Sequence, residues 1–116
     1  MAYRIDGPGV SVVFSGDLDP TALPNLTRLA RGADLLVFNC AVLDPPGSPS
    51  ELYTRHTPPR QIGELARAAG VKRLLLSHIA PLVEKGLAAV VASVTSSYPG
   101  PVEVAQDRMR IRLGGR

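Results

Sequence analysis

The feature that most constrains the fold is the run Leu74–His78, in which three leucines precede a serine and a histidine. An apolar run this short, with turn residues such as Gly70 and Pro81 on its two sides, is typical of a buried central strand rather than of a helix. In open α/β sheets, ligands and reactive side chains gather at the carboxyl ends of such strands. We therefore expect His78 to lie at a functional edge of a sheet.

Two other apolar runs end in the same way, since Val10–Phe14 leads into Ser15-Gly16-Asp17 and Leu35–Phe38 leads into Asn39-Cys40. A glycine before Asp17 lets the backbone turn sharply and aims the carboxylate away from the strand. Because parallel strands end at one edge, we expect Asp17 and His78 to meet there and to hold a metal ion. The simpler alternative for Asp17 is a turn or helix cap, a frequent role of aspartate.

The remaining pattern predicts alternating strands and helices. Asp6-Gly7-Pro8-Gly9 is a turn sequence that favours a hairpin. The Pro-rich and Gly-rich stretch Asp44–Ser50 predicts an irregular loop that is mobile or contacts a partner over the rim. We expect one layered α/β domain over residues 1–116, in the order ββ-α-β-α-β-α-ββ. The expected strands cover 3–5, 10–14, 34–38, 73–76, 102–105 and 109–113, and the expected helices run from Asp19 or Thr21 to Ala30, from Thr57-Pro58 to Ala69 and from Val83 to Ser97.

Composition narrows the class of protein. Hydrophobic residues make up 45% of the 116 residues, which is enough for one packed core. The single cysteine, Cys40, excludes an internal disulfide and favours a reducing, cytoplasmic location. No apolar run reaches the length of a membrane span. Much of the net charge of +3 comes from four arginines near the C-terminus: Arg108, Arg110, Arg112 and Arg116. No aromatic residues lie between these arginines, so composition gives RNA binding little support.

The chain has two histidines, His56 and His78. A histidine is most often structural, but His56 precedes the expected helix start at Thr57-Pro58 and can fold back to the edge that carries His78, where it could act as a general acid. The alternative is an exposed loop residue beside a helix cap. Cys40 ends a strand at the same edge, where a soft metal ligand is one interpretation and a small buried hydrophobe is the more frequent one.

Four short motifs occur in a familiar order: Ser15-Gly16-Asp17, Gly32–Val37, His56-Thr57-Pro58 and Leu74–His78. Together they resemble the second half of metallo-β-lactamase-fold hydrolases, most closely the ribonuclease Z-like branch. The resemblance implies the C-terminal half of an αββα sandwich, with two zinc ions, or iron or manganese, at the sheet edge. It implies that Asp17 bridges the metals, that His78 binds one metal, and that His56 assists as a proton donor or phosphate contact. A metal-activated water in that family cleaves phosphodiester, ester or lactone bonds.

The chain departs from the family pattern at three points. The His-x-His-x-Asp-His motif is missing, Asn39-Cys40 stands where the branch often has a glutamate, and Leu18 replaces a common threonine. Asp17 and His78 alone do not complete a two-metal site. We therefore expect the isolated chain to be inactive and to need a missing N-terminal half or a homo-oligomer partner.

Two alternatives to the hydrolase hypothesis stay open. The first is a non-catalytic module that binds a partner through an exposed sheet. The second, weaker one is a small doubly wound domain with a phosphate site, although no glycine-rich loop follows the first buried strand.

Overall fold

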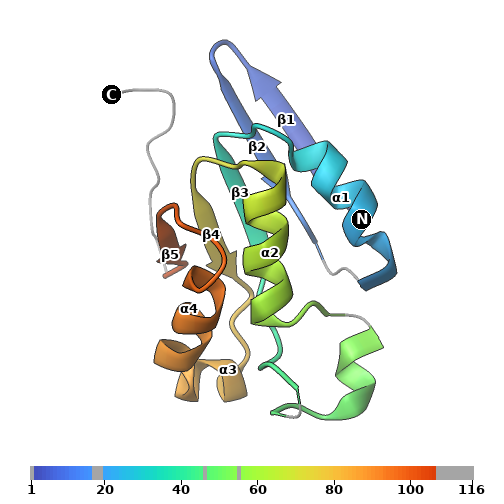
Figure 1. The fold of residues 1–116 in the computed structure, drawn as a ribbon, viewed down its shortest axis with the longest axis vertical. Coiled ribbons are helices and arrows are strands. Elements are labelled where there is room, and N and C mark those ends of the chain that lie inside the picture. The colour runs from blue at the N-terminus through green and yellow to red at the C-terminus, as the bar shows by residue number, and fades with distance from the viewer. Residues whose placement is uncertain (1, 17–19, 46, 55, 107–116) are drawn as a thin grey trace.

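The structure is a computed structural model that describes residues 2–16, 20–45, 47–54 and 56–106. These residues form one five-stranded sheet in the order β1-β2-β3-β4-β5, and the helices lie on one face of it (Figure 1). The strands are β1 Tyr3–Gly7, β2 Val10–Phe14, β3 Leu35–Asn39, β4 Leu74–Ser77 and β5 Val102–Val104. The helices are α1 Leu23–Ala30, α2 Pro59–Ala69, α3 Pro81–Lys85 and α4 Leu87–Thr95, with short 3-10 helices η1 Pro20–Ala22 and η2 Ser50–Thr54.

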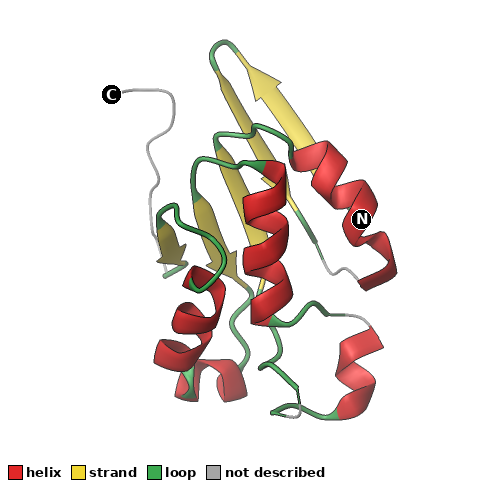
Figure 2. Cartoon of the chain, in the orientation of Figure 1, coloured by secondary structure: helices red, strands yellow, loops and turns green. Residues whose placement is uncertain are grey.

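The sheet begins with the expected hairpin and continues in parallel. β1 pairs antiparallel with β2, whereas the pairs β2–β3, β3–β4 and β4–β5 are all parallel. Helical connections link the parallel strands, so the chain alternates between sheet and helix layer (Figure 2). The carboxyl ends of β2, β3 and β4 therefore share one edge, as the three apolar runs predict.

The hydrophobic core lies between the sheet and the helices. Alternate strand residues face the helices, because successive side chains of a strand point to opposite sides. Val13, Leu36 and Leu74, which are register neighbours or lie on adjacent strands, are all fully buried. The helices contribute the buried stripe expected of α2 and its neighbours: Leu26, Ala30, Ile62, Leu65, Ala66, Ala69, Val90 and Val94.

Helices α2 and α4 approach each other closely at Gly63. A Cβ atom added to Gly63 would lie 2.3 Å from the backbone oxygen of Val94 and 3.1 Å from its Cα atom. Real side chains do not make such contacts, so glycine at this position is what lets the two helix backbones come this near. The contact joins α2, the helix that follows His56, to α4, the second helix after His78.

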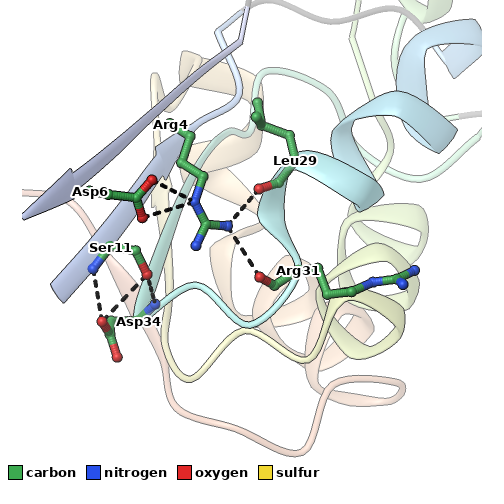
Figure 3. A network of polar contacts seen from close by, with 6 residues as sticks. All are labelled: Arg4, Asp6, Ser11, Leu29, Arg31 and Asp34. Atoms are coloured by element: carbon green, nitrogen blue, oxygen red, sulfur yellow. Dashed lines mark hydrogen bonds and ion pairs between the residues drawn. The ribbon is translucent and has the colours of Figure 1, made fainter. Parts of the chain in front are cut away.

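Polar contacts fix the edge hairpin to the rest of the domain (Figure 3). The Arg4 guanidinium donates hydrogen bonds to the carbonyl oxygens of Leu29, at 2.7 Å, and Arg31, at 3.1 Å. These carbonyls belong to the end of α1, where helical acceptors lack intrahelical donors, so a cation from β1 satisfies them. Asp34, before β3, accepts a 2.8 Å bond from the Ser11 amide in β2.

Several expected boundaries differ from the structure. The single helix predicted over 83–97 is wrong, because α3 ends at Lys85 and α4 begins after Gly86. The predicted cap at Thr57 is also wrong, since Pro58 is the N-cap of α2 and no side chain caps it. Likewise Ala22, not Thr21, precedes α1. The strand expected at 109–113 and the cap expected at Asp19 lie outside the described residues. None of the helices that the structure describes is long and apolar enough to cross a membrane.

Candidate functional site

The strand ends form a compact edge that begins with Ser15. Its amide donates to the Val37 carbonyl oxygen at 2.9 Å, and its hydroxyl oxygen accepts a 3.0 Å bond from the Asn39 amide. Gly16 follows with a φ of +62°, which is the sharp turn that the sequence predicts. Asp17 lies outside the described residues, so its meeting with a histidine at this edge stays a prediction.

The ends of β3 and β4 are also tied together. The Cys40 amide donates to the Ser77 carbonyl oxygen at 2.7 Å, and the Ser77 hydroxyl donates to Oδ1 of Asn39 at 3.1 Å. His78 comes next and has a φ of +52°, so its backbone is left-handed. It alone has this conformation among the described residues that are not glycine. Such a backbone costs a residue with a Cβ atom about 1–2 kcal/mol, and strain of this kind is common at functional sites.

His56 and His78 lie side by side at this edge. Their ring centroids are 6.3 Å apart and their planes differ by 20°, which is a stacked arrangement. The expectation that His56 folds back toward His78 is therefore confirmed as a matter of position. A metal ion lies in the plane of each imidazole that binds it, so two nearly parallel stacked rings do not both point at one ion. The geometry favours separate roles for the two rings.

The His56 ring has an unsatisfied nitrogen. Its Nδ1 atom is buried and has no hydrogen-bond partner among the residues that the structure describes. Buried polar atoms almost always have partners, and an exception calls for an explanation such as a bound ion, a water or a reacting group. A histidine nitrogen held in this way is chemically suited to hold or transfer a proton.

The loop before His56 carries hydrogen bonds that its composition did not indicate. The stretch Asp44–Ser50 is predicted to be irregular, and its described residues are so except Ser50, which begins η2. The Tyr53 hydroxyl donates to the Leu43 carbonyl oxygen at 2.5 Å and accepts from the Ser48 amide at 3.1 Å. The His56 amide then donates to the Leu52 carbonyl oxygen at 3.0 Å. These bonds fix the backbone that carries His56.

Asp44 joins this loop to two helices, a role that sequence reasoning missed because a loop aspartate has many possible partners. Its Oδ1 atom accepts a 3.0 Å bond from the Arg60 amide in the first turn of α2. Its Oδ2 atom accepts a hydrogen bond from the Ser93 hydroxyl in α4. A carboxylate at a helix N-terminus is electrostatically favourable. Asp44 therefore has a structural explanation and is not free to bind a metal.

Cys40 is unsuited to the ligand role that its position at the edge left open. The residue is fully buried, and burial, with a smaller contribution from the charge of Asp44, raises the pKa of its thiol to about 12. Thiolate is the form that binds metals, so a thiol that stays protonated is a poor ligand. The interpretation of Cys40 as a small buried hydrophobe agrees with this environment.

The donor set fits part of a metal site and not the whole of one. His78 offers an exposed imidazole at a strand end, which suits zinc, iron or manganese. Within the described ranges, however, no three side chains of histidine, cysteine, aspartate or glutamate gather closely enough to hold an ion. Closing a site around His78 requires Asp17 and further ligands.

Known proteins share both the sequence and the fold of this chain. The family model for the beta-lactamase superfamily domain matches residues 1–79. Ribonuclease Z from Myxococcus xanthus is 35% identical over 106 residues, which cover 91% of this chain and 34% of that protein. The chain thus spans about a third of the length of this relative.

Two solved structures have the same fold. The metallo-β-lactamase fold protein YhfI from Bacillus subtilis matches with a TM-score of 0.70 and 23% identity, over 90% of this chain and 41% of that one. The short form of human tRNase Z also gives a TM-score of 0.70, with 19% identity, over 97% of this chain and 38% of that one. The predicted αββα-type fold class, represented here by one αβ layer pair, is confirmed.

Proposed function

Because this chain belongs to the beta-lactamase superfamily, we propose that it supplies part of the active site of a metal-dependent hydrolase. The observation that carries the proposal is the stacked pair of His56 and His78 at the carboxyl ends of the parallel strands. Strained backbone at His78 and a His56 nitrogen without a partner among the described residues occur together at this one edge.

In the proposed site His78 and Asp17 are metal ligands, and zinc is the first candidate because imidazole and carboxylate both suit it. Iron or manganese would accept the same ligands. A bound metal supplies a water of lowered pKa. The further ligands that such a site needs are proposed to come from polypeptide other than the 116 residues of this chain.

His56 is proposed to serve as the general acid that protonates the leaving group. Support comes from its half-buried ring, its stacking on His78 and the hydrogen bonds that hold its backbone. A proton donor must be held within reach of the reacting bond without occupying the metal. The nearly parallel rings agree with that division of roles.

The proposed substrate class is a phosphodiester, and RNA is the first candidate because the Myxococcus xanthus relative is named ribonuclease Z. Esters and lactones are the alternative, since a metal-activated water attacks carbonyl carbon as well as phosphorus. Asn39-Cys40 offers His56 no nearby carboxylate at the end of β3, which argues against strict conservation of the ribonuclease Z reaction.

Metal binding tests the ligand assignments directly. Zn²⁺ is titrated into the chain while the imidazole signals of the two histidines are followed by NMR. We expect the His78 signals to shift first, and Asp17→Asn or His78→Asn to weaken binding about tenfold or more, whereas the exposed control Asp6→Asn leaves it unchanged. Zinc uptake that neither ligand substitution affects would reject the roles of Asp17 and His78. No uptake at all would favour the non-catalytic module.

Activity is tested in a chimera that joins the chain to the remaining part of the Myxococcus xanthus relative. The rates with a model phosphodiester, an RNA and a lactone are compared. We expect the phosphodiester to be cleaved, with a loss in kcat of about 10²–10⁴-fold for His56→Ala, as is usual for a general acid. Equal kcat values for His56→Ala and the parent chimera would exclude that role.

A further inference from the structure

The connection between β3 and α2 carries His56 beyond the carboxyl end of β3 (Figure 1). It runs over residues 40–58 and includes η2. A connection of this length without a long helix or strand has many conformations open to it unless contacts fix it. The His56 ring is nevertheless stacked on the His78 ring, with the centroids 6.3 Å apart. The connection therefore needs internal contacts that hold His56 in place.

The start of the connection closes into a tight turn on Leu43. The Leu43 amide donates to the Ser48 hydroxyl oxygen at 2.9 Å, and the Gly47 amide donates to the Asp44 carbonyl oxygen at 2.8 Å. A Cβ atom added to Gly47 would lie 2.8 Å from the Leu43 Cβ atom, so a residue without a side chain is needed for this close approach. Leu43 itself packs against the hydrophobic core. The turn is therefore a fixed base for the residues that follow.

Tyr53 attaches the segment before His56 to this base. Its hydroxyl donates to the Leu43 carbonyl oxygen at 2.5 Å and accepts from the Ser48 amide at 3.1 Å, so one side-chain oxygen joins both sides of the turn. The His56 amide donates to the Leu52 carbonyl oxygen at 3.0 Å. That carbonyl belongs to the peptide unit that joins Leu52 to Tyr53 in η2. The phenol hydroxyl is thus linked to the His56 backbone through a single peptide unit.

The segment after His56 is anchored at the same place. The Asp44 carboxylate accepts a 3.0 Å bond from the Arg60 amide in the first turn of α2. Asp44 directly follows the residue whose carbonyl accepts from Tyr53, so contacts on both sides of His56 converge on one dipeptide. Two attachments to one base restrict both the position and the direction of the His56 backbone. Asp44 also joins α4, whereas the Tyr53 hydroxyl bonds within the connection, which makes Tyr53 the cleaner residue to change.

From these contacts we propose that Tyr53 is a positioning residue, whose hydroxyl holds His56 in its stacked place at the strand ends. The inference rests on the proposed role of His56 as general acid and adds a side chain on which that role depends. A proton donor must stay within hydrogen-bond distance of the leaving atom, and a displacement of about 1 Å can lower a rate by about a hundredfold. Tyr53 touches neither metal nor substrate, and it acts through the backbone of His56.

The first test measures the position of His56 by NMR in the metal-free chain. Tyr53→Phe keeps the aromatic ring and removes the hydroxyl, so the contact between η2 and the turn is lost. We expect the NOEs between the His56 and His78 rings to weaken. Hydrogen exchange of the His56 amide should become about tenfold faster, as the loss of one hydrogen bond that resists local opening predicts.

Tyr98→Phe is the matched control, because it removes another tyrosine hydroxyl that donates to a backbone carbonyl oxygen, that of Val71, at 2.9 Å. It should lower the urea midpoint while leaving the ring NOEs unchanged. Ser48→Ala serves if Tyr53→Phe fails to fold, since it removes the acceptor of the Leu43 amide in the same turn and should also weaken the ring NOEs. Unchanged NOEs in Tyr53→Phe, or in Ser48→Ala where that variant decides, would overturn the proposal. Equal weakening by Tyr98→Phe would overturn it as well.

The second test measures kcat and KM in the chimera. We expect Tyr53→Phe to lower kcat about 10–100-fold and to leave KM within about twofold, because only the proton donor is displaced. The double variant Tyr53→Phe/His56→Ala should be no slower than His56→Ala, since the hydroxyl acts through His56. A parental kcat in Tyr53→Phe, or a further loss in the double variant, would overturn the positioning role. A parental kcat in His56→Ala would instead reject the general acid, whereas weakened ring NOEs in Tyr53→Phe would still support the positioning of His56.

Discussion

Replacing Gly63 with alanine probes the close approach of α2 and α4. In the interior of a helix, alanine is favoured over glycine by about 0.8–1 kcal/mol, so propensity alone predicts a more stable protein. The new Cβ atom, however, would lie 2.3 Å from the Val94 backbone oxygen. A backbone atom in a packed helix cannot move aside as the end of a flexible side chain can.

Overpacking of this kind typically costs about 1–3 kcal/mol, and more where backbones must separate. We therefore expect Gly63→Ala to lower the free energy of unfolding by about 1–2 kcal/mol despite its better helix propensity. Urea unfolding followed by circular dichroism at 222 nm measures this change. Because α2 follows His56 and α4 is the second helix after His78, a separation of α2 from α4 should also weaken the NOEs between the two imidazole rings.

Gly7→Ala is the matched control. Its Cβ atom would meet nothing closer than a Val10 methyl group at 3.6 Å, in an exposed strand. We expect its free energy of unfolding to stay within about 0.5 kcal/mol of wild type. If Gly63→Ala unfolded at the same urea concentration as wild type, or at a higher one, the close approach of α2 and α4 would be refuted.

Three further predictions address the site and the electrostatics. The variant His78→Gly should have a free energy of unfolding about 1 kcal/mol higher than His78→Ala, because the φ of +52° strains a residue with a Cβ atom. At Ala68, which is exposed in α2, alanine should instead be more stable than glycine by a similar amount. If glycine were the more stable residue at both positions, or alanine at both, the left-handed backbone of His78 would be contradicted. The pKa of Asp34 is lowered by the Ser11 amide and by Lys72. The ionised carboxylate therefore stabilises the fold above about pH 4, and this stabilisation is lost as the pH falls through the lowered pKa. The difference in urea midpoint between wild type and Asp34→Asn should shrink from pH 6 to pH 3, and a constant difference would disprove the linkage. The Cys40 thiol, with its pKa raised to about 12, should react with iodoacetamide at pH 8 about a hundredfold more slowly in the folded chain than in urea, whereas similar rates would show that it is accessible.

Sequence patterns predict the sheet well because each strand depends on local features. The run Leu74–His78 and its two counterparts are short, apolar and followed by polar residues, and they become β4, β2 and β3. The glycine that ends α2, Gly70, has the left-handed φ of +69° that its position predicts. The fold class needed only these strands, the helices between them and their order.

Other features are not predicted by the spacing of apolar residues alone. The stretch 83–97 has apolar residues at helical spacing, yet the helix is interrupted at Gly86, a residue of low helix propensity whose effect the apolar spacing does not reveal. Threonine is a favoured residue type at a helix N-cap, but Pro58 takes that position and the Thr57 side chain is almost fully buried. At Thr57 the tertiary environment overrides the preference of the residue type for a capping position.

The candidate site was only partly predictable. Strand ends indicate that His56 and His78 share an edge, and their rings are 6.3 Å apart. The positive φ of His78 had no signal in the sequence, because glycine and not histidine is the usual residue there. Asp17 lies outside the described residues, and its role as a metal ligand stays a prediction.

The order of the strands explains why one face of the sheet carries none of the described helices. From β2 to β5 each new strand is added beside the last, always in the same direction. Right-handed crossovers that advance in one direction put every helix over the same side, as α1, α2 and α4 are. A further helix and strand added beyond β5 with the same handedness would place the helix in the same layer again. A crossover helix on the opposite face would therefore require a connection that runs the other way along the sheet.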